Sequence, residues 1–359
     1  MRKHLTIIHI ISQSRYSGAE RICLDLCAEL QKRGHRIMLL CKSDGNLPHE
    51  AQKRNIETQT PPIFGKINFA APFIIARIAR KLNANIIHSH LSTANLWGSL
   101  AGRLAKIKTV GHIHAINTFY YYKYNNINVT CSNGVRRSML AQGATPEHLR
   151  VVYNGILPER FENILSRSKA RAMLGLDADS FVIVCVAHLS PRKGQIFLLR
   201  AISNLRGRIP KLKCLFLGDG KLDDFLQREA INLCVADCVQ FLGFRHDAIS
   251  VMNSADIATL PSIAKEGLGL VLLEAALLGI PAIASDAPGI DEAIEHGKTG
   301  LLVPPGDAAA LADAIETLYA NKKLRLSMGH AGRERTSRMF ALSSMANAFE
   351  AIYAELHSA

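Results

Sequence analysis

Two glutamates in the second half of the chain carry the clearest chemical signal, Glu266 and Glu274, with seven residues between them. Glu274 is the only charged residue between Gly267 and Ser285, in a segment whose apolar residues predict a buried helix. A buried carboxylate needs a partner, because losing its hydration is costly. The partner is either a cation or backbone cap, or the hydroxyl groups of a ligand such as a ribose. Glu266 lies in the preceding loop, either as a solvated charge or near the same ligand.

A basic turn, His188–Gly194, follows the apolar run Phe181–Ala187. Lys193 can reach a phosphate as a flexible point charge, with Arg192 beside it. The same pattern also fits an ordinary solvated turn. The sequence Gly218-Asp219-Gly220 follows the next apolar run, and its residue types are above all typical of a turn.

A short loop with two glycines precedes the predicted helix that carries Glu274. Free backbone amides at a helix N-terminus, together with the helix dipole, favour an anion. The third glycine of a dinucleotide-binding fingerprint is absent, so this pattern alone is weak. The residues that could present these amides are Gly267, Leu268, Gly269 and Leu270.

Four histidines form two His-x-His pairs, His88 with His90 and His112 with His114. Side chains two residues apart in a strand face the same way, so the four could line one crevice. This spacing occurs in metal sites, but no carboxylate or cysteine nearby in the sequence completes a ligand set, so we expect no metal. A catalytic or substrate-binding histidine is the favoured interpretation. For His88 and His112, a role as satisfied strand-end histidines stays equally open.

The eight cysteines form no Cys-x-x-Cys pair. We expect most of them to be buried small hydrophobic residues in a reducing compartment. Cys234 and Cys238 lie four residues apart without the paired histidines of a zinc site.

The candidate residues follow segments that are typical of strands in parallel sheets. Apolar runs alternate with amphipathic stretches, as in domains that cover both faces of a parallel sheet with helices. Two such series of roughly 150 residues predict two doubly wound α/β domains. The predicted strands are 5–11, 36–41, 85–89, 108–113 and 127–131 in the first series, and 181–187, 212–217, 239–242, 256–260 and 281–284 in the second.

The predicted helices complete this alternation. The first opens at Ser17–Glu20, where serine and glutamate three residues apart can form a capping box. We place the first domain at 1–160 and the second at 171–340, with the junction in the polar stretch 156–180. The last helix, about 342–359, is a candidate to pack back on the first domain. Further helices are predicted at 70–82, 94–105, 195–206, 221–234, 246–254, 269–278, 307–320 and 323–337.

The net charge of +13 is concentrated in the first half of the chain. Residues 1–170 hold 24 lysines and arginines against 9 acids, whereas the remainder is close to neutral. A basic half suits an anionic partner such as a phosphorylated substrate, an anionic membrane surface or a nucleic acid. Because no Lys/Arg block exceeds two residues, a nucleic-acid tail is not expected. The cluster Phe119–Tyr124 mixes aromatic and basic residues, and an acceptor-gripping loop explains it as well as nucleic-acid binding does.

No apolar run reaches the ~18 residues needed to cross a bilayer. The first apolar run, Leu5–Ile11, is too short for the core of a signal peptide, so we expect a cytoplasmic protein. The segment Phe69–Lys81 is basic and amphipathic. It is either a helix that lies on a membrane surface, or a helix whose apolar side faces the core and whose basic side is solvated.

Taken in order, these segments resemble glycosyltransferase family 4, the retaining nucleotide-sugar enzymes of the GT-B fold. Glu266 and Glu274 are similar to the family's E-x7-E motif, and H-L-S-P-R-K-G at 188–194 is similar to its R-L-x-x-x-K-G segment. S-G-A-E at 17–20 resembles the N-terminal G-G-A-E loop, and V-Y-N-G at 152–155 resembles the entry into the second domain. The resemblance runs from Ile10 to about Leu318.

The resemblance implies two Rossmann-like domains with parallel sheets that face an interdomain cleft. It implies that Glu274 binds the nucleotide ribose, that Glu266 lies near the donor sugar, and that Lys193 neutralises the diphosphate. His114 would lie near the reacting carbon. Other implied donor contacts come from His188, Arg192, Gly18, Gly218, Asp219 and Arg245, and from the amides of 267–270; His90, Tyr120 and Tyr121 are acceptor candidates.

The implied reaction transfers a sugar from a nucleotide donor, with a UDP-sugar favoured over a GDP-sugar, and retains the anomeric configuration. The acceptor would be an anionic glycan or glycolipid of a bacterial envelope polysaccharide or lipopolysaccharide. The enzyme would need no metal or other cofactor, and it could contact the inner membrane surface. An epimerase on the same fold and a basic nucleic-acid-binding protein are the alternatives. One departure is His188, because the family usually has an arginine there, which stays charged and binds phosphate through two donors.

Overall fold

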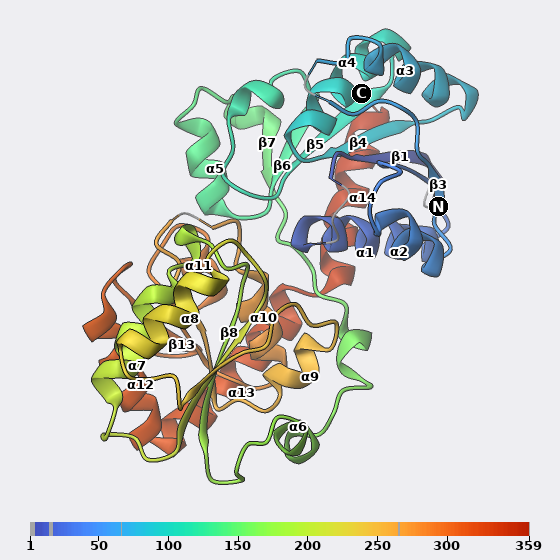
Figure 1. Cartoon of the computed structure of the whole chain (residues 1–359). Coiled ribbons are helices and arrows are strands. Elements are labelled where there is room, and N and C mark those ends of the chain that lie inside the picture. The colour runs from blue at the N-terminus through green and yellow to red at the C-terminus, as the bar shows by residue number, and fades with distance from the viewer. Residues whose placement is uncertain (1–3, 14–16, 66, 265, 359) are drawn as a thin grey trace. The chain divides into compact units, whose positions relative to one another are not determined.

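The computed structural model describes residues 4–13, 17–65, 67–264 and 266–358 of the 359-residue chain (Figure 1). The chain divides into two compact units. Unit 1 comprises the chain up to Leu157 together with the segment from Phe340 onward, and unit 2 runs from Pro158 to Met339.

Unit 1 is built on a seven-stranded sheet in the order β3-β2-β1-β4-β5-β6-β7, and every pair of neighbours is parallel. The central strands are almost wholly buried, as their apolar sequences predict. The strands are β1 (Thr6–Ile11), β2 (Arg36–Leu40), β3 (Glu57–Gln59), β4 (Ile86–His90), β5 (Lys108–Ile113), β6 (Ile127–Thr130) and β7 (Leu149–Val151).

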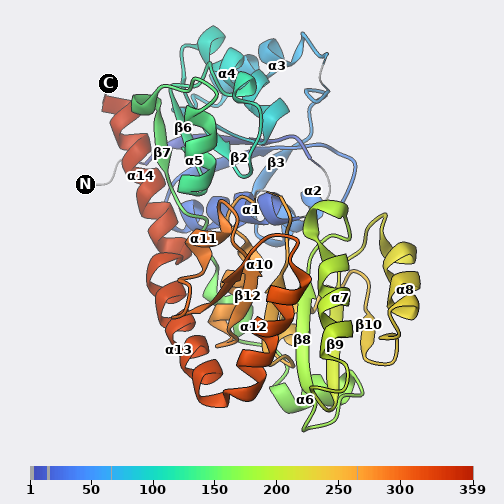
Figure 2. The same cartoon turned by 90° about the vertical axis from the view of Figure 1, so that its left-hand side faces the viewer.

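Helices cover both faces of this sheet (Figures 1 and 2). On one face, Ile8, Ile10 and Ile87 pack with residues of α3 and α4, including Ile75 and Trp97. The alternate residues of the strands face α1 and α14 instead. The helices of this unit are α1 (Gly18–Lys32), α2 (Leu47–Lys53), α3 (Ala71–Lys81), α4 (Ser92–Ala105), α5 (Asn133–Leu140) and α14 (Leu342–Ser358), with short 3₁₀ turns η1 (Phe119–Tyr121) and η2 (Pro146–His148).

The last helix, α14, belongs to unit 1 although it follows all of unit 2 in the sequence. The chain returns through a bridge between Ile156 and Ala341. Phe349 and Tyr353 of α14 are fully buried, and α14 packs beside α1. Gly155 permits this return, because a Cβ there would lie 2.5 Å from the Leu342 Cα.

Unit 2 contains a six-stranded sheet in the order β10-β9-β8-β11-β12-β13, again parallel throughout. The strands are β8 (Phe181–Val186), β9 (Leu212–Leu217), β10 (Val239–Phe241), β11 (Ile257–Leu260), β12 (Ala282–Ser285) and β13 (Gly300–Val303). The helices are α6 (Arg167–Met173), α7 (Gln195–Leu205), α8 (Asp223–Asn232), α9 (Ala248–Met252), α10 (Leu270–Leu277), α11 (Ile290–Ala293), α12 (Ala308–Ala320) and α13 (Lys322–Met339), with 3₁₀ turns η3 (Pro158–Phe161) and η4 (Pro191–Lys193).

The prediction of two parallel, doubly wound sheets is confirmed, but several short elements were not predicted. Strands β3, β7 and β13 and helices α2, α5, α6 and α11 have only three to eight residues each. Segments of this length contain too few apolar residues to show a period. None of the helices in the described residues is long and apolar enough to cross a membrane.

Candidate functional site

Four loops at the carboxyl edge of the unit 2 sheet are joined by backbone hydrogen bonds. They follow β8, β9, β11 and β12, the edge where ligands bind in open α/β sheets. The Leu189 amide donates to the Asp219 carbonyl at 2.8 Å, and the Ile263 amide donates to the Arg192 carbonyl at 2.9 Å. The Glu266 amide donates to the Pro288 carbonyl at 3.2 Å. The segments around Lys193, Asp219 and Glu266 therefore form one connected surface.

Lys193 and Glu266 meet in this surface. The Lys193 Nζ lies 2.8 Å from the Glu266 Oε1, and the Ser262 hydroxyl donates to the same oxygen at 2.8 Å. The Lys193 side chain is 16% exposed and that of Glu266 is 8% exposed. Both contacts use Oε1, and no hydrogen bond to Oε2 occurs within the described residues. The arrangement can present a carboxylate oxygen to a hydroxyl group and spare ammonium protons to an anion.

Two glycines let these loops approach each other. Gly194 has a φ of +68°, and a Cβ there would lie 2.0 Å from the Pro261 carbonyl oxygen. Gly218 has a φ of +136°, and a Cβ would lie 2.1 Å from the Ala187 carbonyl oxygen. Only glycine fits both the backbone angle and the space. The left-handed φ of Gly218 therefore supports the interpretation of 218–220 as a turn.

Glu274 lies on the second turn of α10 and its side chain is 7% exposed. The Arg160 Nη1 donates to its Oε1 at 2.9 Å. Of the alternatives left open for this carboxylate, the ion pair is thus present, and a ligand contact would add to it or compete with it. Arg160 in η3 was not singled out from the sequence, because 114 residues separate it from Glu274 and nothing local marks the pairing.

The loop with the two glycines leads into the N-terminus of α10, as the sequence predicted. Gly269 precedes the helix with a left-handed φ of +71°, and Leu270 is the first helical residue. Leu268 is buried, so of the segment 267–270 it is the backbone that can meet a ligand. The first amides of α10 have no helical partners, which makes this end suited to an anion.

The other basic candidates of unit 2 are less buried. His188 Nδ1 lies 3.5 Å from Asp219 Oδ1, and both side chains are about half exposed. The side chain of Gln195 donates to the His188 carbonyl at 3.1 Å and anchors this turn. Arg192 is exposed. Arg245 binds Asp247 through two hydrogen bonds of 2.8 and 2.6 Å, so its guanidinium is already engaged.

In unit 1, the segment Ser17–Glu20 begins α1 as predicted. The Glu20 carboxylate accepts a hydrogen bond from the Ser17 amide at 3.2 Å, which completes a capping box. Gly18 is the first residue of the helix and is partly exposed. It lies at the carboxyl edge of the sheet, after β1, the position expected for a ligand-binding loop.

The four predicted histidines share one face of the unit 1 sheet, joined by His9 of β1. The five rings stack at centroid distances of 3.9–5.6 Å between neighbours. His90 Nδ1 lies 2.9 Å from His114 Nε2, and His88 Nδ1 lies 2.6 Å from the Tyr353 hydroxyl. The expectation that they share a face is confirmed, but they lie in the core under α14, not along an open crevice.

Burial favours the neutral form of the four histidines that the sequence singled out. Desolvation, reinforced by the neighbouring imidazoles, lowers the pKa of His88, His90 and His112 well below the ordinary value. Desolvation lowers the pKa of His114 to about 3. His90 is fully buried, whereas His114, just beyond β5, keeps 9% of its surface exposed. Of the four, His114 is thus the one that is not fully buried.

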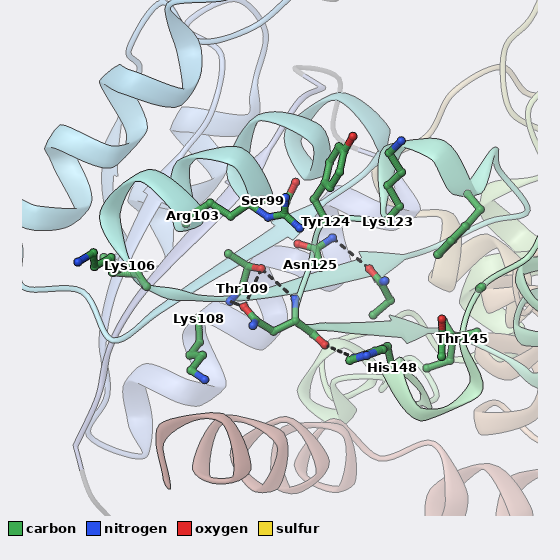
Figure 3. A pocket seen from close by; sticks show the side chains of 17 residues that line it. Ser99, Arg103, Lys106, Lys108, Thr109, Lys123, Tyr124, Asn125, Thr145 and His148 are labelled. Atoms are coloured by element: carbon green, nitrogen blue, oxygen red, sulfur yellow. Dashed lines mark hydrogen bonds between the residues drawn. The ribbon is translucent and has the colours of Figure 1, made fainter. Parts of the chain in front are cut away.

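The aromatic and basic cluster Phe119–Tyr124 borders a cavity of about 600 Å³ in unit 1 (Figure 3). Cationic side chains line the cavity from α4, from the start of β5 and from the cluster itself, and no acidic residue lines it; they are Arg103, Lys106, Lys108 and Lys123. Arg103 and Lys123 lie over the Tyr124 ring at 4.6 and 4.7 Å. Tyr120 is exposed, whereas Tyr121 is partly buried against the core, and neither lines the cavity.

Comparison with known families matches both units. Residues 16–160 match the family described as Glycosyltransferase Family 4, and residues 166–335 match Glycosyl transferases group 1. The chain is 23% identical over 350 residues to the UDP-Gal:alpha-D-GlcNAc-diphosphoundecaprenol alpha-1,3-galactosyltransferase of Escherichia coli, covering 90% of each chain. It is 36% identical over 176 residues to the GDP-mannose-dependent alpha-(1-6)-phosphatidylinositol monomannoside mannosyltransferase of Mycolicibacterium smegmatis, covering 47% of this chain and 46% of that protein.

A similar fold is found among solved structures. The crystal structure of Anabaena Alr3699/HepE in complex with UDP superposes with a TM-score of 0.88 at 23% identity, covering 98% of this chain and all of that one. At this identity the likeness establishes the fold.

Proposed function

The chain belongs to the group 1 and family 4 glycosyltransferases and has their GT-B fold, and from this membership we propose its sugar donor, its acceptor and the residues that bind them. We propose a retaining transfer of a hexose-type sugar from a UDP-sugar to a glycan or lipid-linked acceptor of the bacterial envelope. The observation that carries the proposal is the largely buried Lys193–Glu266 pair at the carboxyl edge of the unit 2 sheet.

The proposed role of this pair follows from the charge that moves in the reaction. When a nucleoside diphosphate leaves, negative charge grows on its phosphate and positive charge grows on the sugar. Lys193 supplies a fixed cation for the phosphate, and the first amides of α10 supply partial positive charge beside it. Glu266 holds Lys193 in place through Oε1, and its Oε2 accepts from a donor-sugar hydroxyl.

Glu274 is proposed to hold the nucleotide through the ribose hydroxyls. A carboxylate fixed on a helix accepts two adjacent hydroxyl groups well, and such charge-assisted hydrogen bonds are among the stronger ones. Arg160 orients Glu274 through a 2.9 Å hydrogen bond before the ligand arrives. We propose that His114 lies near the reacting carbon of the donor sugar, because it is the one of the four histidines that keeps part of its surface exposed.

The choice of UDP as the donor nucleotide rests on relatives. The Anabaena protein was crystallised with UDP, and the Escherichia coli enzyme is a UDP-Gal transferase. The Mycolicibacterium enzyme is GDP-mannose-dependent and more similar in sequence, but over less than half of its length. We therefore propose UDP and make GDP an outcome of the test. No metal takes part in the proposed reaction, because Lys193 and the α10 amides already oppose the diphosphate charge.

The acceptor is proposed to be anionic, and the enzyme to work at the cytoplasmic face of the inner membrane. The cavity beside Phe119–Tyr124 is lined by four cationic side chains without an acid, which suits a phosphate-bearing group. In α3, Ile75, Ala76 and Ala79 face the core, so this side of the helix is not a membrane contact. Phe69 before the helix and Phe73 on it are 75% and 65% exposed. Exposed aromatic rings near basic residues are typical of an interfacial surface.

The experiment that tests this function measures nucleoside diphosphate release from UDP-, GDP- and ADP-sugars, with and without a polyprenyl-diphosphate-linked sugar as acceptor. We expect release that requires the acceptor and prefers a UDP-sugar, and a product whose new bond keeps the donor's anomeric configuration by NMR. Free epimerised sugar without any acceptor would instead indicate an epimerase. Inversion of configuration would contradict the proposed mechanism.

A further inference from the structure

The buried histidines of unit 1 lie next to two cysteines of α1, and this cluster is separate from the residues assigned to the transfer reaction in unit 2. Cys23 and Cys27 are four residues apart on α1, so both face the sheet, and both are fully buried. Opposite them lie His9 of β1 and His90 of β4, which are also fully buried. The cysteines are far from His90 in the sequence, and the fold brings them together because α1 packs beside β1.

The ligand atoms of this cluster are close together. His9 Nδ1 lies 3.0 Å from His90 Nε2. One ligand atom from each of His9, Cys23 and His90 falls within 4.8 Å of the other two. The Cys27 side chain hydrogen-bonds that of Cys23 and interacts with His9. Ligands at about 2.0–2.3 Å around a tetrahedral zinc ion lie roughly 3.3–3.8 Å apart, so small shifts suffice for the three atoms of His9, Cys23 and His90. Cys27 is the candidate fourth ligand through its contacts with Cys23 and His9.

Hydrogen bonding in this core is incomplete without a further partner. His9 Nε2, His88 Nε2, His114 Nδ1 and both ring nitrogens of His112 are buried without a hydrogen-bond partner among the described residues. Native cores rarely leave so many polar atoms unsatisfied in one place. His9 Nε2 is the one of these atoms that belongs to the cluster with Cys23 and Cys27, and a cation bound there would supply its missing partner.

We propose that unit 1 holds a structural zinc ion through Cys23, Cys27, His9 and His90. Two thiolates and two neutral imidazoles are a ligand set that zinc prefers. The two thiolate charges cancel the charge of Zn²⁺, so the occupied site is neutral, as a dry core requires. The second histidine group, His88, His90 and His112, lacks a thiolate and would bury two uncompensated charges.

The ion would connect the core to His114. When His90 binds zinc through Nε2, its proton must be on Nδ1, which lies 2.9 Å from His114 Nε2. His90 then donates this hydrogen bond, so the proton of neutral His114 is on Nδ1. The ion therefore acts as an organiser of α1, β1 and β4 and fixes the tautomer of His114. It takes no part in the transfer chemistry, which stays metal-free.

The test measures metal in the full-length chain, produced with a tag that contains no histidine, purified under reducing conditions and desalted after exposure to zinc. We expect about one zinc per chain by elemental analysis. Replacement of zinc by Co²⁺ should give the near-ultraviolet charge-transfer absorption of cobalt bound to thiolate. This readout does not depend on sugar transfer, so its failure and that of the proposed function are distinguishable.

Two matched double variants locate the site. Cys23→Ala with Cys27→Ala should lower the zinc content to about 0.1 per chain or less, because zinc sites that lose two ligands rarely hold the ion. Cys185→Ala with Cys214→Ala changes two equally buried cysteines in unit 2 and should leave the zinc content unchanged.

Three outcomes overturn the proposal. A wild-type chain with less than about 0.1 zinc and no cobalt–thiolate absorption would refute the site, and this result needs no variant to fold. Retention of zinc by the Cys23/Cys27 variant, with loss in His112→Gln, would assign the ion to the three-histidine group instead. A disulfide between Cys23 and Cys27 under reducing conditions would leave no thiolates for the metal.

Discussion

At the scale of single residues, the site depends on carboxylates and cations that share hydrogen bonds. Lys193 both neutralises Glu266 and, in our account, opposes the diphosphate. Glu274 is paired with Arg160 in the same unit. These four charges therefore have partners without the substrate, which keeps their side chains ordered before binding.

Replacing Lys193 by alanine should lower kcat at saturating donor by about 10²–10³-fold, because a fixed charge on the leaving group is lost. It also leaves Glu266 buried without its cation, so the free energy of unfolding should fall by about 3 kcal/mol. Steady-state kinetics and denaturant unfolding measure the two effects. Lys213→Ala, a matched change in the same unit that removes only an exposed contact to the Asp237 carbonyl, should alter neither. Unchanged kcat in Lys193→Ala would rule out its proposed role.

The sequence identified most of these residues but not their pairs. Glu274 was recognisable because it is the only charge in an apolar segment, and Lys193 because it follows a strand. Arg160 and Ser262 carry no comparable signal, since their partners are set by the fold. The same limit applies to His9, whose neighbours His88 and His90 lie about eighty residues away in the chain.

At the scale of elements, turns decide how closely the loops of the candidate site can meet. Gly194→Ala should lower the free energy of unfolding by at least about 3 kcal/mol and weaken donor binding, because the new Cβ would displace the Pro261 carbonyl as well as strain φ. The control is Gly207→Ala, which has a similar φ of +79° but open space around it. It should cost only about 1 kcal/mol. Equal costs for the two variants, measured by denaturant unfolding, would contradict the close approach.

The exposed phenylalanines around α3 make a second prediction at this scale. Phe69→Ser with Phe73→Ser should weaken binding to vesicles rich in anionic phospholipid about tenfold, because two apolar side chains no longer enter the interface. The measurement is co-sedimentation with anionic and with zwitterionic vesicles. Phe225→Ser, at an exposed phenylalanine of unit 2, serves as the control. Equal binding of the wild type to anionic and zwitterionic vesicles, or unchanged binding of the double variant to anionic vesicles, would contradict the membrane contact.

Periodicity predicted the long elements well and the short ones poorly. The helices α7, α10 and α12 lie within one or two residues of their predicted bounds. Strands of three or four residues such as β3 and β13 depend on pairing with a neighbour more than on their own composition. Sequence also could not show that α1 faces the histidines, since this depends on how the helix packs on the sheet.

At the scale of the whole molecule, the chain leaves unit 1 at Leu157 and returns to it at Phe340. Unit 2 is a single stretch of the chain and has its own core. Unit 1 needs α14 to cover the histidine face, because Phe349 and Tyr353 pack on His88.

This difference predicts how fragments behave. A fragment of residues 158–339 should unfold cooperatively and bind a nucleoside diphosphate within about tenfold of the full chain, as an autonomous domain would. A fragment of residues 1–157 should stay unfolded until a peptide of residues 340–359 is added. Circular dichroism and calorimetric titration report the two results. A stable 1–157 fragment without that peptide would show that α14 is dispensable.

The central claim is that unit 2 binds a nucleotide through Glu274, and isothermal titration with UDP, GDP and ADP tests it most directly. We predict that the wild-type chain binds UDP most tightly and that Glu274→Gln weakens this binding about 10–100-fold, the loss expected for hydrogen bonds to a charged group. Glu316→Gln, at an exposed pair with Arg208, should bind as the wild type does. No heat with any of the three nucleotides, or unchanged UDP affinity in Glu274→Gln, would contradict the account.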